Sequence, residues 1–308
     1  MILYYDLHVH TNESDGKYSK LEILRYTSKK GIKVIAFCDH NVCDNINSNK
    51  IATEYQNEYN ERLNTLIIPA IEIDTDNVTY RRIHILGYGL RKPELIRKKL
   101  FEIQMSNVKA TEKQIEIINK LYGTRISEEL VEKLEGTKYI SSQGLKLALV
   151  NLGIAKDMRD TYRFVSRRSP THVDRIKIQD IEAIKLIKKA GGVAILAHPI
   201  EVCRKDTGEK IGHTQEYEEY IKYLITYGLD GVESHTIKHN QGERQKYLEI
   251  NNKYNLLSTA GTDFHDEIRT PKLGTDYEPE KFLFPLLERI RKENNKVIES
   301  ESSRDDER

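Results

Sequence analysis

The sequence has no tryptophan, three cysteines and no uninterrupted apolar run of about 18 residues. Without such a run, we expect no membrane-spanning helix. The cysteines form neither a Cys-x-x-Cys pair nor an even disulfide set, so we expect a reducing compartment, most simply the cytoplasm. The first residues lack a basic segment followed by an apolar stretch, and we therefore expect no signal peptide.

Two common catalytic motifs are also missing. The sequence contains neither Gly-x-Ser-x-Gly nor a glycine-rich phosphate-binding loop that ends in lysine. Their absence disfavours a serine nucleophile and a P-loop nucleotide site. If the chain catalyses hydrolysis, it therefore needs a nucleophile of another kind.

Charge is nearly balanced over the whole chain but not along it. The 308 residues carry a net charge of +1 and are 38% hydrophobic, as in a globular protein with a sizeable core. Residues 91–190 hold 22 Lys and Arg against 13 Asp and Glu, and the remainder holds 27 against 35. A basic segment beside acidic residues would suit an anionic substrate. A lysine-rich helical surface would explain the same distribution equally well.

Short apolar runs alternate with amphipathic segments over most of the chain. This alternation predicts parallel strands joined by crossover helices, hence an α/β fold. Polar residues follow five or more of the predicted strands at their carboxyl ends. Because so many strand ends contribute, a β/α barrel is favoured over an open sheet, which gathers its site at one switch point. The strand ends carry His8 and His10, Asp39 and His40, Glu72, His198, and Asp263 and His265.

One segment breaks the alternation. Residues 92–177 predict a long helix over Glu94–Leu121 and shorter helices over Glu128–Leu134 and Gly144–Leu152, without a strand. We interpret them as a helical insertion that caps a barrel formed by residues 1–91 and 178–295. The charged residues 296–308 predict a disordered tail.

Nine side chains of metal-binding type occur in this framework. Imidazole and carboxylate groups suit divalent transition metals, and nine exceed the needs of one ion. A bridging carboxylate would let them hold two or three ions. Each residue alone has an ordinary structural explanation; Asp15-Gly16, for example, is a common turn. The nine are His8, His10, Asp15, His40, Glu72, His84, His198, Asp263 and His265.

As a set, these motifs resemble the PHP (polymerase and histidinol phosphatase) superfamily, in the family's order and over most of the chain. The resemblance rests on His8-Val9-His10, Ser14-Asp15-Gly16, Cys38-Asp39-His40, Glu72, His84, Ala197-His198-Pro199 and Gly261-Thr262-Asp263-Phe264-His265. It implies a distorted (β/α)7 barrel that hydrolyses phosphate esters through a metal-bridging hydroxide. It also implies one ion at His8, His10, Glu72 and Asp263, a second at Glu72, His84 and His198, and a third at Asp15, His40 and His265.

Within that superfamily, the chain looks most like the branch of nucleotide phosphatases and 5′–3′ exoribonucleases. The helical insertion, the Asp15-Gly16 turn and Gly231-Val232-Glu233 followed by His239 carry this likeness. It implies that His239 contacts phosphate or acts as a general acid. Arginine matches phosphate geometry well, so Arg163 and Arg159 in the insertion are our candidates for a second phosphate, with Arg168 behind them. Residues 141–144 lack the Arg or His that this branch would have there.

The sequence therefore predicts a cytoplasmic, metal-dependent phosphoesterase. Its expected substrates are nucleoside 3′,5′-bisphosphates or the 5′ ends of short RNAs, and its expected cofactors are two or three Mn²⁺, Zn²⁺ or Fe²⁺ ions. A histidinol-phosphate phosphatase remains the alternative within the same class. A non-catalytic module that binds metals or nucleotides is the alternative from a different class.

Overall fold

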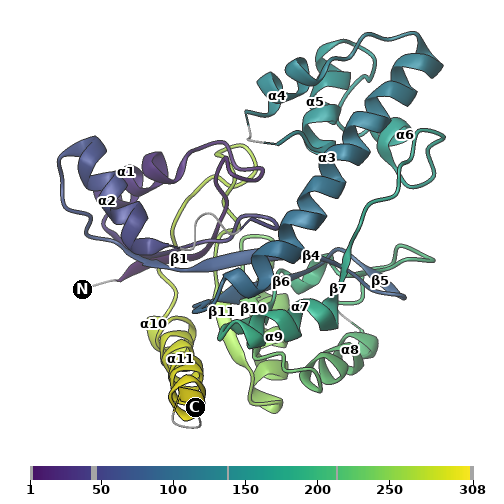
Figure 1. Ribbon diagram of the computed structural model, residues 1–308. Helices are drawn as coiled ribbons and strands as arrows, with labels where there is room; N and C mark the ends of the chain where they lie inside the picture. The colour runs from purple at the N-terminus through teal and green to yellow at the C-terminus, as the bar shows by residue number, and fades with distance from the viewer. Residues whose placement is uncertain (1–2, 43–46, 137–138, 213, 306–308) are drawn as a thin grey trace.

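The computed structural model describes residues 3–42, 47–136, 139–212 and 214–305. Strands and helices alternate along most of this length, which confirms the predicted α/β class (Figure 1). The first part contains β1 Tyr4–Val9, α1 Lys20–Lys30, β2 Ile32–Phe37, α2 Ser48–Tyr59, β3 Leu66–Ile68, β4 Ala70–Asp76, β5 Tyr80–Arg81 and β6 Ile83–Tyr88. After the central helices follow β7 Ile178–Gln179, α7 Asp180–Lys189, β8 Val193–Leu196, β9 Cys203–Arg204, α8 Gln215–Ile225, β10 Gly231–His235, α9 Gln241–Lys253, β11 Leu257–Ala260, α10 Pro279–Phe282 and α11 Phe284–Asp305.

Helix α1 shows why these elements form where they do. The Ser19 side chain accepts a hydrogen bond from the backbone of Glu22, and the Glu22 side chain bonds back to the Ser19 backbone. This capping box satisfies amide groups that the first turn leaves unpaired. Gly31 ends the helix in the left-handed conformation, at φ 71°.

The strands form sheets of three, six and two strands in the described parts of the chain. Their orders are β1-β2-β3, β11-β10-β8-β6-β4-β7 and β5-β9. Isolated bridges between Val9 and Phe264 and between His40 and Glu72 connect the first two sheets. One apolar cluster also spans them, with Leu7 of β1 packed in the same core as Ile195 of β8. These ladders do not by themselves close a barrel, which stays a prediction.

Strand β6 departs from the parallel arrangement that the alternation predicted. It runs antiparallel to both of its neighbours, β4 and β8. Only the short connection through β5 separates β4 from β6, and a crossover helix needs a dozen or more residues. The strand therefore has to turn back beside β4. His84, its second residue, thus lies at the edge where the parallel strands end.

The position of Glu72 also differs from the prediction. Glu72 was expected at the carboxyl end of a strand, but Pro69 separates β3 from β4 and Glu72 is the third residue of β4. Proline has no amide hydrogen for the ladder, so the strand breaks there. Strand β4 then continues past the site to Asp76.

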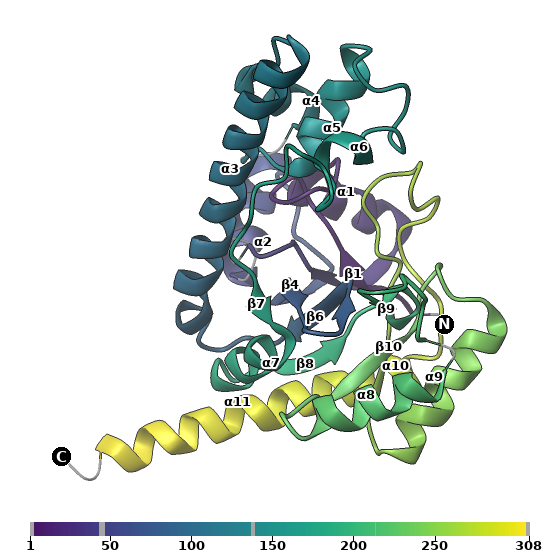
Figure 2. The same ribbon diagram turned by 90° about the vertical axis from the view of Figure 1, so that its right-hand side faces the viewer.

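Residues 92–177 contain the three helices that the sequence predicted, within a few residues. They are α3 Glu94–Tyr122, α4 Glu128–Glu135 and α5 Ser142–Asn151, followed by the short α6 Tyr162–Val165. These helices share an apolar core that includes Ile118, Leu145 and Phe164. Figures 1 and 2 show α4, α5 and α6 as a lobe at the far end of α3.

The C-terminal segment corrects the sequence analysis. Residues 296–308 were expected to be disordered, yet α11 runs to Asp305, and the remaining residues of that segment lie outside the described chain. A helix that has already formed gains one hydrogen bond for each residue it adds, so even a charged segment can extend it. Within the described residues, no helix is both long and apolar enough to span a membrane.

Candidate metal centre

The structure brings all nine predicted donors together. Their nitrogen and oxygen atoms form groups in which every donor atom lies within 4.8 Å of the others. Three of these groups contain the residue sets that the resemblance implied, with His10 added to the third. The groups are His8, His10, Glu72 and Asp263; Glu72, His84 and His198; and His10, Asp15, His40 and His265.

The first group starts on β1, where residues two apart face the same side. His8 and His10 are fully buried, and their Nε2 atoms are 3.2 Å apart. His10 Nε2 also lies 3.2 Å from Asp263 Oδ1. Asp263 follows β11, and Gly261 lets that chain approach β1, because a Cβ at Gly261 would lie 2.5 Å from the Cβ of His8.

Glu72 occupies the centre of the site. Its Oε1 lies 2.9 Å from His198 Nε2 and 3.0 Å from His84 Nδ1, and its Oε2 lies 3.2 Å from His10 Nε2. Burial would raise the pKa of this carboxyl, but the surrounding histidines, His40 and His8 foremost, hold it well below the usual range. Glu72 is therefore an ionised carboxylate whose two oxygens face different donor groups, as a bridging ligand requires.

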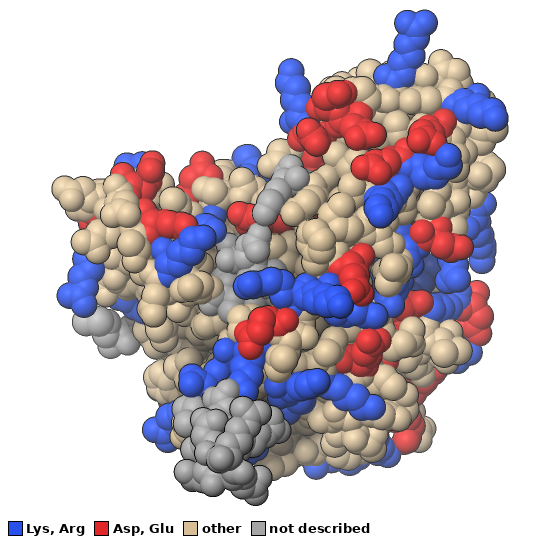
Figure 3. Space-filling view, in the orientation of Figure 1, with Lys and Arg blue, Asp and Glu red and all other residues tan. Residues whose placement is uncertain are grey.

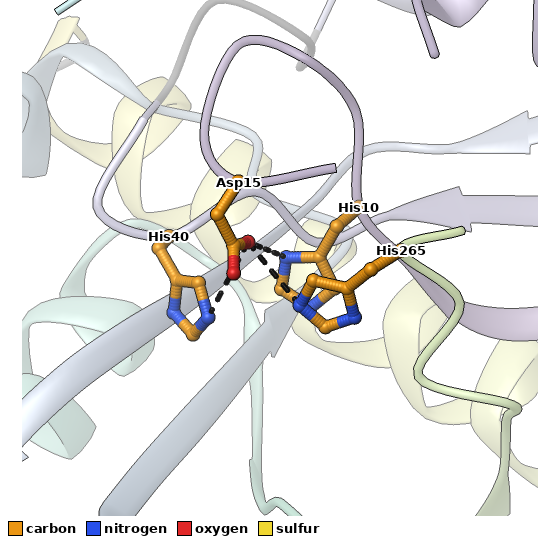
Figure 4. Close-up of side chains that lie close together, drawn as sticks. All are labelled: His10, Asp15, His40 and His265. Carbon is orange, nitrogen blue, oxygen red and sulfur yellow. Dashed lines mark ion pairs between the residues drawn. The ribbon is translucent and has the colours of Figure 1, made fainter. Parts of the chain in front are cut away.

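The third group depends on the turn after β1. Asp15 Oδ1 lies 3.2 Å from His265 Nε2, 3.6 Å from His10 Nδ1 and 3.9 Å from His40 Nε2 (Figure 4). The turn needs Gly16, because a Cβ there would lie 2.5 Å from the carbonyl oxygen of His10. The predicted Asp-Gly turn is thus part of the site.

Asp39 holds this turn in place rather than joining a donor group. It accepts hydrogen bonds from the Thr11 amide at 2.8 Å, the Thr11 hydroxyl at 2.8 Å and the Ser14 hydroxyl at 2.7 Å. Because Asp39 is the second residue after β2, it fixes the loop that carries Asp15 against the end of that strand.

Unpartnered polar atoms show that the donor set fits bound cations. Two buried donor atoms of the site, His10 Nδ1 and His198 Nδ1, have no hydrogen-bond partner among the described residues, although buried polar atoms rarely lack one. The donors around them are imidazole and carboxylate groups, the donor types of Zn²⁺, Mn²⁺ and Fe²⁺ sites.

Three further charged residues lie at this site, and the sequence analysis gave none of them a role there. Asp74 forms a fourth possible group with His40 and His84, and its Oδ1 lies 2.7 Å from His40 Nδ1. Lys238 Nζ lies 2.6 Å from Asp263 Oδ2. Glu233 contacts His8 from behind. Asp74 could have been found, because it is two residues after Glu72 on one strand and so shares its face.

A cavity of about 530 Å³ opens beside the donors, within the size range of small-molecule sites. One wall contains donors of the site, including Asp15, His40 and His84, and another contains residues 139–143 before and within α5. Its cationic lining residues are Arg81, Arg82, Arg175 and Lys177.

Arg175 is the most suitable of these cations for an anion. Its Nη2 donates to Gln114 Oε1 at 3.2 Å, but its buried Nε has no hydrogen-bond partner in the described structure. Burial lowers the pKa of this guanidinium. Arg175 and Arg82 also lower the pKa of nearby Lys146, whose largest cause of lowering is its own burial. Arg82, Arg175 and Lys146 therefore concentrate positive charge beside the cavity.

The predicted substrate arginines lie elsewhere. Neither Arg163 nor Arg159 lines the cavity, and neither does Arg168. Arg163 donates to the Ile154 carbonyl at 2.8 Å and pairs with Asp160 at 3.1 Å, so its guanidinium stabilises a loop of the lobe. Their position in the insertion did not show which way these side chains face.

His239 is the residue for which the resemblance implied phosphate contact or acid catalysis. It is 2% exposed, and its Nδ1 donates to the carbonyl oxygen of Ser234 at 2.9 Å. Burial lowers the pKa of His239. It is not among the described residues that line the cavity, and the implied role stays a prediction.

Comparisons with known proteins were made on the whole chain, and no family model matches it. A 5′-3′ exoribonuclease from Haemophilus influenzae is 26% identical over 293 residues, which cover 93% of this chain and 98% of that protein. A phosphoribosyl 1,2-cyclic phosphate 1,2-diphosphodiesterase from Eggerthella lenta is 24% identical, covering 87% and 97%. A 3′,5′-nucleoside bisphosphate phosphatase from Chromobacterium violaceum is 22% identical, covering 84% and 86%.

Solved structures share the fold. An amidohydrolase from Chromobacterium violaceum matches with a TM-score of 0.73 and 20% identity over 94% of this chain and 96% of its own. A protein from Bifidobacterium adolescentis, described as a candidate metal-dependent phosphoesterase, matches with a TM-score of 0.67 and 23% identity over 89% and 91%. These relatives and folds confirm the resemblance to phosphoesterases that was drawn from the motifs.

Proposed function

We propose that this protein is a metal-dependent phosphoesterase that acts on nucleotides, either nucleoside 3′,5′-bisphosphates or the 5′ ends of short RNAs. The observation that carries the proposal is one cavity with two kinds of lining. Its floor holds imidazole and carboxylate donors, and its wall holds Arg82 and Arg175. A substrate with two phosphate groups would place one on each lining.

Different residues of the chain would hold the metal ions, fix the site and orient the substrate. Bound divalent ions, whether Mn²⁺, Zn²⁺ or Fe²⁺, would supply Lewis acidity and an activated water. Glu72 holds two donor groups at a fixed separation, and Asp39 fixes the turn that carries Asp15. Arg175 and Arg82 would orient a remote phosphate, so that the scissile ester is positioned before reaction.

The finer architecture is part of the proposal. We infer that the sheets close into a distorted (β/α)7 barrel around the core shared by β1 and β8, and that residues 92–177 are its cap. The cavity supports the cap, because residues 139–143 line it opposite His40. This arrangement limits solvent access to the donors from the side of the lobe.

Three of the similar proteins support a nucleotide or phosphosugar substrate by their own activities. Residues 141–144 lack the expected Arg or His, and in this chain Arg82 and Arg175 offer cations from other segments. On the face shown in Figure 3, lysine and arginine side chains are interspersed with acidic ones.

The test is the release of phosphate or of mononucleotides by Mn²⁺-loaded protein from four substrates: 3′,5′-bisphosphoadenosine, a 5′-phosphorylated RNA oligomer, AMP and histidinol phosphate. Preference for the bisphosphate or the RNA supports the proposal. Preference for histidinol phosphate would assign the alternative phosphatase activity. Metal binding without hydrolysis of any of them would favour the non-catalytic module. A 1,2-cyclic phosphoribosyl phosphate extends the panel to the activity of the second relative.

A further inference from the structure

Glu233 lies behind the donor site and belongs to none of its groups. It is the third residue of β10, is fully buried and sits between two strands that carry donors. Its Oε1 lies 3.0 Å from His8 Nδ1, and its Oε2 accepts the backbone amide hydrogen of His198 at 2.8 Å. One carboxylate therefore contacts the side chain of one donor and the backbone of another.

The first contact fixes the position of a proton. An ionised carboxylate can only accept hydrogen bonds, so His8 Nδ1 must carry the hydrogen. A neutral imidazole then has its lone pair on Nε2. That atom faces the first donor group, 3.3 Å from Glu72 Oε2 and 3.5 Å from Asp263 Oδ1. The opposite tautomer would present an N–H to the same place and could not ligate.

The second contact supports an unusual backbone conformation. His198 has φ 23° and ψ 64°, in a region that residues with a side chain rarely adopt. Its amide is held by Glu233, and its imidazole Nε2 consequently lies 2.9 Å from Glu72 Oε1. Glu233 thus links a donor of the first group to a donor of the second.

We propose that Glu233 is a positioning residue that sets the tautomer of His8 and the backbone of His198, and so prepares two neighbouring groups for metal binding. The inference rests on the proposed function only in taking these groups as metal sites. Carboxylate partners of ligating histidines orient the ring and raise its basicity, and losing one typically costs about 10- to 100-fold in metal affinity.

The decisive variant is Glu233→Gln, which keeps the shape of the side chain. A glutamine amide offers one acceptor and one NH₂ group, so it cannot accept from both His8 and His198. If its oxygen serves His198, its NH₂ faces His8 and forces the hydrogen onto Nε2. If its oxygen faces His8 instead, its NH₂ group faces the amide N–H of His198, and two donors then meet without an acceptor. Either outcome disturbs one donor group.

Two measurements without substrate test the proposal. Competition titrations with Mn²⁺ or Zn²⁺ against a chromophoric chelator should show about 10- to 100-fold weaker binding in Glu233→Gln. Nitrogen-15 spectra of the Zn²⁺-loaded native protein should show a hydrogen on His8 Nδ1 and none on Nε2. The matched control is Asp180→Asn, another buried carboxylate, which bonds Tyr220 and Asn77 instead of a donor histidine. Its metal affinity should remain native.

Each result has a definite meaning. A hydrogen on His8 Nε2 instead of Nδ1 in the Zn²⁺-loaded native protein would overturn the proposal, as would a folded Glu233→Gln with metal affinity within twofold of native. If Glu233→Gln does not fold, the spectrum of the Zn²⁺-loaded native protein still decides the tautomer. Native protein that binds metal but releases neither phosphate nor mononucleotides would contradict the proposed function and leave the role of Glu233 standing.

Discussion

The sheet edges and the helical lobe contribute to the same cavity in different ways. At the sheet edges, donors such as His8, His10 and Glu72 are buried and held by neighbouring strands. Opposite them, the residues nearest the lobe come from loops and helix starts, such as Ser141 and Arg175. Because strands fix a side chain's direction and loops do not, the chemistry is anchored on one side and substrate selection can vary on the other.

The largest effect is expected on the sheet side. Glu72→Gln removes the charge whose oxygens face two donor groups, so phosphate release should fall below detection while far-ultraviolet circular dichroism stays native. The control is Glu216→Gln, whose carboxylate bonds Tyr80 and Arg204, and which should retain activity. Near-native turnover of metal-loaded Glu72→Gln would show that the donors are not the catalytic centre.

Metal removal should come next. Dialysis against a chelator should abolish phosphate release, and Mn²⁺ should restore it. Metal present at 100 times its dissociation constant would stabilise the fold by about 2.7 kcal/mol, so the thermal midpoint should fall in the metal-free protein and rise again on reloading. An unchanged midpoint together with unchanged activity would contradict a bound-metal site at the sheet edges.

A smaller effect is expected on the side of the lobe. Arg175→Met should raise the KM for a bisphosphate about 10- to 100-fold, since a hydrogen bond to a charged group contributes about 1.5–3 kcal/mol, and leave the kcat nearly unchanged. Arg163→Met, in the same lobe but outside the cavity, is the matched control and should keep the native KM. The reverse result would restore the sequence-based choice of arginines.

The smallest effect tests the turn between the two sides. Ser14→Ala removes the 2.7 Å hydrogen bond to Asp39, whose other two contacts to Thr11 remain. Losing one such bond costs about 0.5–1.5 kcal/mol, so metal affinity should fall about two- to tenfold. If Ser14→Ala instead abolished metal binding, the position of the turn would depend on Ser14 alone.

The sequence predicted which nine side chains come together because its signals are local. His8 and His10 share a face because they are two residues apart on an extended segment, and the order of the motifs indicated the others. Asp74 stands in the same relation to Glu72 on β4 but was not among the predicted donors. The predicted helices of residues 92–177 were also correct, since each has a clear apolar repeat and most end at a glycine, such as Gly123 or Gly136.

Other features depend on contacts between distant segments and could not be predicted. Arg175 lies at the cavity because the chain after α6 returns beside α3. No local sequence pattern predicts this return. The role of Glu233 needs three strands to be adjacent. Arg163 has a guanidinium group, which suits phosphate, but this group bonds to Ile154 and Asp160 within its own loop.

The reversed direction of β6 sets the length of α3. Because β6 enters at the donor edge with His84, it leaves at Tyr88 on the opposite side of the sheet, beside the start of β8. A chain that must return to the donors has to cross the depth of the molecule. Helix α3, with 29 residues, spans about 43 Å and makes this crossing in one rigid element (Figure 2). The same helix that holds the lobe therefore also lines the cavity, through Ile103, Gln104 and Asn107.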